Sequence, residues 1–457
     1  MHFPAWSIAP FVGLLICIAV LPLLPQSARL WERNTVKAAV ALGLGLPVAA
    51  WVTLRGQSDL VVHSVGEYIQ FIVLIGALFV VSGGIHLDGR IAASPRNNTA
   101  ILALGGVLAS LIGTTGAAML LIRPLLATNA HRKERAHTVV FAILVIANCG
   151  GLLTPLGDPP LYIGFMRGVP FTWTLALTGP WLFINGMLLL TYYSLDRMQW
   201  ARDPLSAAVA DSTDKARVRV RGAGNVVWLL VIIASVALLG EQPWLRVLVQ
   251  LAAALGSYLT TDRGLRYERN GFTWGPIIEV AALFSGIFLT MVPALEFLRE
   301  HAAALPLNEF TLFAFSGGLS AVLDNAPTYL TFFEMATQLS VPGAAVIAGV
   351  PEPYLIAISL GAVTCGAMTY IGNGPNFMVK AVAEAAEVKM PSFTGYIGWT
   401  VRYLAPILLC MVLIFIGTSV ETTLAGVALA LVLAGAAVRR IVRSRGLSVD
   451  EPVSSTV

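Results

Sequence analysis

The sequence predicts an all-α polytopic membrane protein, and three observations carry this prediction. Charged residues make up 12% of the 457 residues, about half the share of roughly 25% that is usual for soluble domains. Hydrophobic residues make up 57% of the chain, and the mean hydropathy is +0.78. Apolar stretches long enough to cross a bilayer, about 20 residues each, recur along the chain. This composition excludes a soluble enzyme, a disordered protein and a nucleic-acid-binding protein.

The apolar stretches predict about 11 full spans. They lie near residues 8–25, 38–54, 67–86, 138–165, 172–192, 223–240, 244–261, 275–298, 353–387, 395–417 and 420–437. Two further apolar segments, 99–128 and 308–340, are too long for one span and are broken in the middle. The first breaks at Gly113-Thr114-Thr115-Gly116 and the second at Asp324-Asn325-Ala326-Pro327. We therefore expect two re-entrant hairpins, each entering and leaving the membrane on the same side.

The basic residues fix the expected orientation. With the N-terminus external, the C-terminus cytoplasmic and both broken segments folded as hairpins, 22 of the 29 Lys and Arg residues fall on the cytoplasmic side. Only four fall in external loops, namely Arg55, Arg167, Arg246 and Arg299. Because basic residues concentrate on the inner side of membrane proteins, this split favours a multi-pass protein of the cell inner (plasma) membrane in that orientation.

The polar stretch 193–222 divides the chain into two membrane halves. We expect an N-terminal half over 1–192 with the inner hairpin 99–128, a cytoplasmic linker over 193–222, a C-terminal half over 223–438 with the outer hairpin 308–340, and a cytoplasmic tail over 439–457. The hairpin tips correspond with an offset of 209 residues, and the stretches 149–165 and 364–380 with an offset of 215. An odd number of crossings separates the two halves, which predicts an inverted repeat.

Broken apolar segments at corresponding positions of an inverted repeat indicate the midplane site of a secondary transporter. Small residues also allow helices to pack closely, but close packing does not explain the Asp, Asn and Pro residues beside the glycines. In the stretch 147–160, Asp158 precedes two prolines, which predicts a helix that stops near Gly150 and restarts after Asp158. Asn148, Thr154 and Asp158 are candidate cation ligands there; the alternative is that Asp158 only caps the new helix.

The second half carries the matching break and the more polar hairpin tip. Candidate neutral ligands at the break are Thr369, Asn373 and Asn376, with Asn373 at the position of Asp158. At the tip, Asp324, Asn325 and Thr328 are candidates for cation or proton handling, since an acid inside a membrane is a functional hypothesis by default. The first tip offers only the hydroxyls of Thr114 and Thr115. Glu279, after Pro276, is either a proton relay or an interfacial acid.

Cofactors and catalysis leave no signal in the sequence. The four cysteines stand apart without a CxxC motif or a Cys/His cluster, so neither a disulfide framework nor a zinc site is expected. No constellation of nucleophile, base and metal ligands is found, so we do not expect an enzyme. The expected partners are the lipid bilayer, sodium ions and protons, with no nucleic acid.

These motifs resemble the ion-transporter superfamily, which groups NhaD-type sodium/proton antiporters, arsenite permeases, and citrate and dicarboxylate carriers. The residues that carry the resemblance are NCGG and TPLGDPP within 148–160, LDNAPT at 323–328 and TYIGNGPN at 369–376. SGGIHLDG, GTTGA and LDNAPTYLTFFEMA are most similar to bacterial proteins assigned as sodium/proton antiporters. Family members usually carry Asn or Asp at the first hairpin tip as well, where this chain has Thr114 and Thr115. The resemblance implies a homodimer in which the hairpins move against a scaffold.

Two functions follow from these features. A sodium/proton antiporter by alternating access is favoured by the two acids, because a carboxylate can hold either a proton or sodium and this competition gives exchange. The alternative is a cation-coupled symporter of citrate or a related carboxylate, which would need an anion cradle made by helix N-termini and a base such as Arg123 or Lys380. A channel or a non-transporting scaffold would not need acids at paired breaks.

Overall fold

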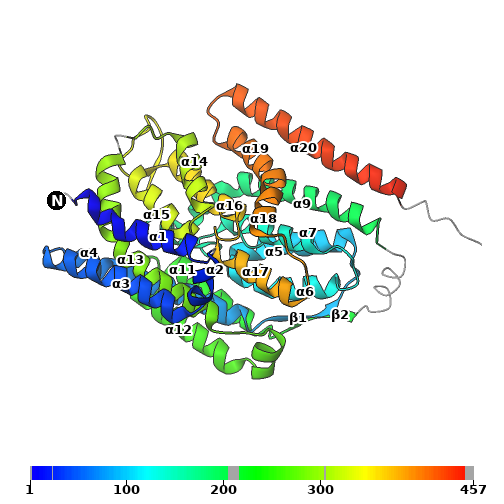
Figure 1. Cartoon of the computed structure of the whole chain (residues 1–457), viewed down its shortest axis with the longest axis horizontal. Coiled ribbons are helices and arrows are strands. Elements are labelled where there is room, and N and C mark those ends of the chain that lie inside the picture. The colour runs from blue at the N-terminus through cyan, green and yellow to red at the C-terminus, as the bar shows by residue number, and fades with distance from the viewer. Residues whose placement is uncertain (1–2, 23, 204–215, 303–304, 448–457) are drawn as a thin grey trace, which may run out of the picture.

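The computed structural model describes residues 3–22, 24–203, 216–302 and 305–447, which are mostly helical (Figure 1). This confirms the all-α polytopic membrane fold. Among the described residues, six helices are long and apolar enough to cross a membrane, or seven if the bent pair Phe393–Tyr403 and Ala405–Phe415 is one span. Other expected spans contain shorter apolar helices, so the count of about 11 spans stays a prediction.

Every apolar stretch singled out in the N-terminal half contains helix. Its elements are η1 (Ala5–Ile8), α1 (Ala9–Val20), α2 (Pro25–Trp31), α3 (Asn34–Leu54), α4 (Ser58–Ser82), β1 (His86–Arg90), α5 (Pro95–Ile112), α6 (Thr114–Thr128), α7 (Ala136–Val145), η2 (Cys149–Leu153), α8 (Pro159–Met166), η3 (Phe171–Leu177) and α9 (Thr178–Trp200).

The C-terminal half repeats this pattern of long helices, a broken hairpin and a broken span. Its elements are β2 (Ala216–Arg221), α11 (Asn225–Leu238), α12 (Pro243–Thr260), η4 (Gly264–Arg269), α13 (Gly275–His301), α14 (Glu309–Ser320), α15 (Asn325–Ala336), β3 (Val346–Ile347), β4 (Val350–Pro351), α16 (Glu352–Cys365), η6 (Gly366–Met368), α17 (Gly374–Ala385), α18 (Phe393–Tyr403), α19 (Ala405–Phe415) and α20 (Val420–Leu447).

The first hairpin is formed by α5 and α6, which pack against each other around Gly113. Gly113 has φ +81°, a left-handed conformation that glycine adopts without strain. At the open end of the hairpin the amide nitrogen of Asn98 donates to Asn129 Oδ1 at 2.8 Å, and Asn129 returns a bond of 2.9 Å. The two ends of the hairpin therefore lie side by side, as a segment that enters and leaves on one side requires.

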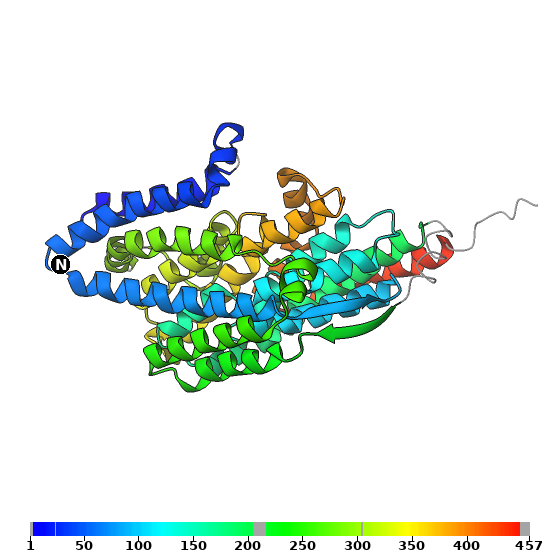
Figure 2. The same ribbon diagram turned by 90° about the horizontal axis from the view of Figure 1, so that it is seen from below.

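The helices form two groups. In the first, α3 and α4 pack against α13, and α4 also packs against α11 and α12. In the second, the hairpins α5–α6 and α14–α15 pack with α8, α9, α16 and α17. Figure 2 shows α11 and α12 along one edge of the molecule and the N-terminal helices along the opposite edge. In Figure 1, α20 lies on the outside of the second group, against α9 and α19.

The boundary between the halves differs from the expectation in detail. Helix α9 continues to Trp200, past the expected start of the linker at residue 193, and α20 continues to Leu447, past the expected start of the tail at 439. The end of the linker pairs as β2 with β1 in an antiparallel ribbon. This pairing places residues 86–90 and 216–221 at the same end of the molecule, in keeping with both being cytoplasmic. Residues 204–215 of the linker and 448–457 of the tail lie outside the described residues.

Arg246, which was counted with the external loops, lies in the first turn of α12 and is 2% exposed. Pro243 begins this helix, because proline suits the first helical turn and lacks only an N–H that would be unpaired there. Arg246 is thereby carried inward among the packed helices.

Candidate functional site

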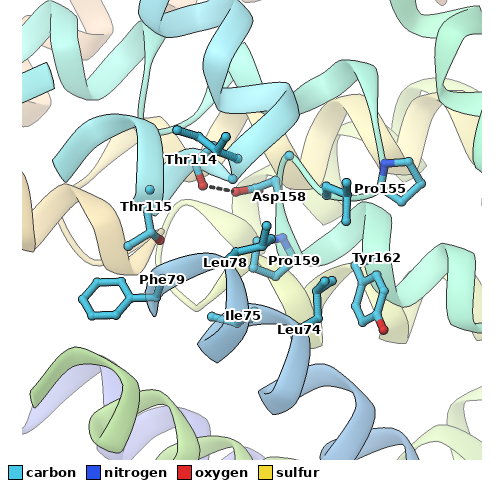
Figure 3. A pocket seen from close by; sticks show the side chains of 15 residues that line it. Leu74, Ile75, Leu78, Phe79, Thr114, Thr115, Pro155, Asp158, Pro159 and Tyr162 are labelled. Atoms are coloured by element: carbon cyan, nitrogen blue, oxygen red, sulfur yellow. Dashed lines mark hydrogen bonds between the residues drawn. The ribbon is translucent and has the colours of Figure 1, made fainter. Parts of the chain in front are cut away.

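Asp158 lies at the centre of the candidate site. It precedes Pro159 and Pro160, the start of α8, yet its side chain does not cap that helix. Its carboxylate instead accepts hydrogen bonds from Thr114 Oγ1 at 2.9 Å, Asn325 Nδ2 at 2.5 Å and Asn373 Nδ2 at 3.3 Å. Figure 3 shows the Thr114–Asp158 bond. With a side chain 2% exposed, Asp158 joins both hairpin tips to both broken spans.

Each break is also hydrogen-bonded to the hairpin in the same half of the chain. Thr154 donates a hydrogen bond to the Ser110 carbonyl of the first hairpin, and Thr369 donates one of 2.5 Å to the Ala321 carbonyl of the second. The backbone N–H of Thr114 donates to the Gly157 carbonyl at 2.8 Å. These bonds satisfy backbone carbonyls that the broken helices would otherwise leave unpaired inside the membrane. The two threonines occupy corresponding positions of the predicted repeat.

Three asparagine amides connect the two breaks with each other. Asn148 Nδ2 donates to Asn376 Oδ1 at 2.7 Å, and Asn373 Nδ2 donates to Asn148 Oδ1 at 3.2 Å. All three side chains are buried. The residues singled out at the two breaks thus meet across the centre of the molecule, although they lie more than 200 residues apart in the chain.

Asp324 behaves differently from Asp158. Its carboxylate accepts from the backbone N–H of Ala326 at 3.0 Å and so caps α15, while Thr328 Oγ1 donates to the Asp324 carbonyl at 3.0 Å. It is the neighbouring Asn325 that reaches Asp158. The second acid therefore shapes the hairpin tip, and the tip contacts the site through an amide.

An unpaired oxygen of Asn325 lies beside the Asp158 carboxylate. Asn325 is fully buried, and its Oδ1 has no hydrogen-bond partner among the described residues, while its Nδ2 is bonded to Asp158. A buried acceptor without a partner is costly. Carboxylate and amide oxygens are the ligands that hard cations prefer. The oxygens of Asp158 and Asn325 are thus of the kind that bind a hard cation such as sodium.

A narrow cleft of about 50 Å³ opens beside Asp158. Its walls come from α4, the first hairpin tip and the start of α8 (Figure 3). Thr115 lines this cleft, together with Leu74, Leu78 and Tyr162. The cleft gives the Asp158 region its access to the boundary between the two helix groups.

The other candidate residues lie elsewhere. Glu279 of α13 forms an ion pair of 2.5 Å with the buried Lys37 of α3, away from the hydrogen bonds around Asp158. Lys380, a candidate base for an anion cradle, pairs with Glu384 at 2.8 Å. The guanidinium of Arg123 lies against Gly271. None of these three side chains contacts Asp158 within the described part of the chain.

Comparison with known protein families gives a match over most of the chain. A family described as "Putative citrate transport" matches residues 1–416 of the chain. No curated protein matches the sequence significantly.

Proposed function

The chain belongs to this citrate-transport family, and from that premise we propose that it is a secondary active transporter that couples its cargo to sodium ions or protons held at Asp158. In this proposal it works by alternating access at a midplane site between two inverted repeats. It lies in the inner membrane with its N-terminus external, and it assembles as a homodimer.

The single observation that supports this function most strongly is the orientation of the Asp158 carboxylate. An aspartate before two prolines would ordinarily cap its own helix. This carboxylate instead turns to Thr114, Asn325 and Asn373. A buried acid shared by four membrane segments is costly unless it is used, and an ion that binds there affects the contacts of all four segments.

Sodium/proton exchange is the simplest function of such a group. A carboxylate holds either a proton or sodium, so the two cations compete for one site. In this proposal sodium binds between Asp158 and Asn325 Oδ1, and a proton on Asp158 displaces it. Thr154, Thr328, Thr369, Asn148, Asn373 and Asn376 support the sodium site from the breaks and the second tip, while Asp324 positions Asn325.

Citrate symport with the same cation is the second candidate, because the family that matches the chain is described as putative citrate transport. A symporter would fill the cleft beside Asp158 with a carboxylate anion once sodium or a proton has bound. The two candidates share the cation site and differ only in whether an anion accompanies the cation.

One pair of assays separates the candidates. Everted membrane vesicles carrying the protein are energised, and dissipation of the pH gradient on addition of sodium is followed by fluorescence. The same vesicles and intact cells are tested for uptake of labelled citrate with and without sodium. Sodium-induced dissipation without citrate uptake supports exchange, and cation-dependent citrate uptake supports symport. Absence of both activities from vesicles that contain folded protein would refute a cation-coupled carrier.

A further inference from the structure

Arg246 is a buried cation that pairs with no carboxylate among the residues that the structure describes. Its Nη2 donates to Gln70 Oε1 at 2.7 Å and its Nη1 to the Gly240 carbonyl at 3.5 Å, while its Nε is buried without a partner. The whole residue is 2% exposed. A charge buried without a counter-charge is strongly destabilising, and inside a membrane protein such a residue is expected to serve function.

A second unpaired group faces this guanidinium. The hydroxyl of Tyr162 on α8 is buried beside the Arg246 guanidinium and finds no acceptor for its proton among the described residues. The Arg246 Cζ lies 6.0 Å from the centre of the Tyr162 ring and 5.0 Å from that of Phe165. Arg246 Nε belongs to the first helix group and the Tyr162 hydroxyl to the second. Both are unsatisfied donors, and they lie on the two sides of one contact.

This contact adjoins the cleft beside Asp158. Tyr162 and Leu74 line the cleft, and Gln70, which holds Arg246, stands one turn before Leu74 on α4. Figure 3 shows the Tyr162 hydroxyl directed away from the Thr114–Asp158 bond. Asp158 therefore lies on one side of the cleft. The contact between Tyr162 and Arg246 lies beyond the Tyr162 ring that lines it.

We propose that Arg246 and Tyr162 form a subsite for a carboxylate group of the transported anion. This inference rests on the second candidate function, cation-coupled carriage of a carboxylate. Arginine holds carboxylates through paired N–H donors, and the free Nε and the Tyr162 hydroxyl are donors that an entering carboxylate would satisfy. The cation then binds at Asp158 and the carboxylate at Arg246, on opposite sides of the Tyr162 ring. The two ions therefore depend on different residues.

Packing alone accounts for only part of this arrangement. The rings of Tyr162 and Phe165 stabilise a guanidinium through cation–π contact, and Gln70 and Gly240 satisfy two of its nitrogens. Neither provides an acceptor for the Tyr162 hydroxyl. Arg266 offers the matched comparison, since it is 1% exposed, stacks on Tyr258 and Phe272, and also leaves Nε unpaired. It lies in η4, outside the lining of the Asp158 cleft.

The test is binding of citrate to the purified protein in detergent with sodium present, measured by calorimetry. We expect Arg246→Gln to weaken citrate binding roughly ten- to a hundredfold, because a hydrogen-bonded charge is lost. Arg246→Lys should keep part of the affinity, and Tyr162→Phe should weaken binding about two- to tenfold. Arg266→Gln, a buried arginine of the same kind, should bind citrate like the unaltered protein. Size-exclusion profiles and melting temperatures report whether each variant folds.

Three results would overturn the subsite. In the first, folded Arg246→Gln binds citrate as tightly as the unaltered protein. In the second, Arg246→Gln does not fold and Tyr162→Phe shows undiminished affinity. In the third, the unaltered protein binds no citrate, which removes the symport candidate as well. Sodium-dependent dissipation of the pH gradient, measured on the same preparations, keeps these failures distinct from a failure of cation coupling at Asp158.

Discussion

Asp158 and Asp324 are both acids at helix starts, but only Asp324 caps its helix. Asn keeps the size of Asp and caps about as well, so Asp158→Asn removes the charge with little other change. We expect this variant to reach the membrane in normal amounts and to lose cation-dependent transport, because the group that exchanges the proton for sodium is gone. Western blotting and vesicle assays measure both. Full sodium-dependent transport by Asp158→Asn would disprove the role of this carboxylate.

Asp324 gives the opposite expectation. Because its carboxylate accepts from the Ala326 N–H at 3.0 Å, Asp324→Asn should retain the cap and near-normal transport. Asp324→Ala should lose the cap, which typically contributes about 1 kcal/mol, and it should also loosen the tip that carries Asn325. Melting temperature and transport rate of the two variants, compared side by side, check this. Equal loss of transport in both variants would show instead that the negative charge of Asp324 is needed.

The sequence singled out polar residues that the structure brings together, but it did not show which of them bond to each other. Asp158, Asn325 and Asn373 stand out because an acid or amide beside Pro and Gly in an apolar stretch is unusual. The first hairpin tip contributes Thr114 and the second contributes Asn325. These contributions depend on how two distant hairpins meet, and no local sequence pattern specifies that. The sequence does not set Arg246 apart, because counting basic residues by loop does not show which of them are buried.

The first broken span requires close backbone approach. A Cβ atom added to Gly157 would lie 2.0 Å from the Gly151 carbonyl oxygen, so the break could not keep its shape. We expect Gly157→Ala to lower the stability by about 1–3 kcal/mol, the usual range for overpacking, and to displace Asp158. Gly374→Ala is the control, since nothing lies within 4 Å of its added Cβ. Thermal unfolding in detergent measures both, and equal melting temperatures for the two variants would contradict this view of the break.

An ion-pair cluster joins three helices at the far end of α8 from Asp158. Arg167, directly after α8, bonds Glu67 of α4 at 3.0 Å and also pairs with Glu334 of α15. The cluster holds two buried carboxylates and one guanidinium, and the exposed His63 lies 3.3 Å from Glu67. Helices α8 and α15 are thereby linked twice, by Asp158–Asn325 at their starts and by Arg167–Glu334 near their ends.

The charge balance of this cluster predicts unequal effects. Arg167→Gln leaves two buried carboxylates facing each other and should destabilise the protein by about 3–5 kcal/mol. Glu67→Gln leaves the neutral Arg167–Glu334 pair and should cost much less. The melting temperatures of the two purified variants give the comparison. A larger loss for Glu67→Gln than for Arg167→Gln would mean that the helices are not held by this charge balance.

The positions of helices, hairpins and breaks were easier to predict than the contacts between them. Pro at helix starts, Gly at turns and apolar length predicted both hairpins and both breaks close to where they occur. Helices α9 and α20 continue beyond the expected ends of their spans, to Trp200 and Leu447. Arg197 and Arg440 both hydrogen-bond serines of the neighbouring long helix.

For the whole molecule, the two hairpins occupy corresponding places, and each is fastened to its own break by a threonine. Those paired contacts favour the predicted inverted repeat, in which the two halves enter the membrane from opposite sides. The orientation then decides from which side the cleft beside Asp158 is reached. Positions that lie in exposed loops on opposite faces therefore provide the sharpest test of the architecture.

Lys133 and Glu241 are suitable positions, because both are exposed and follow the first hairpin and α11 respectively. The neighbouring Arg132 is unsuitable, since it is buried against Asp196 at 2.5 Å. In a background without the four native cysteines, we expect Glu241→Cys to react with a membrane-impermeant maleimide on intact cells. Lys133→Cys should react only after permeabilisation, because the hairpin returns to the cytoplasmic side. Labelling of Lys133→Cys on intact cells would mean that residues 99–128 cross the membrane.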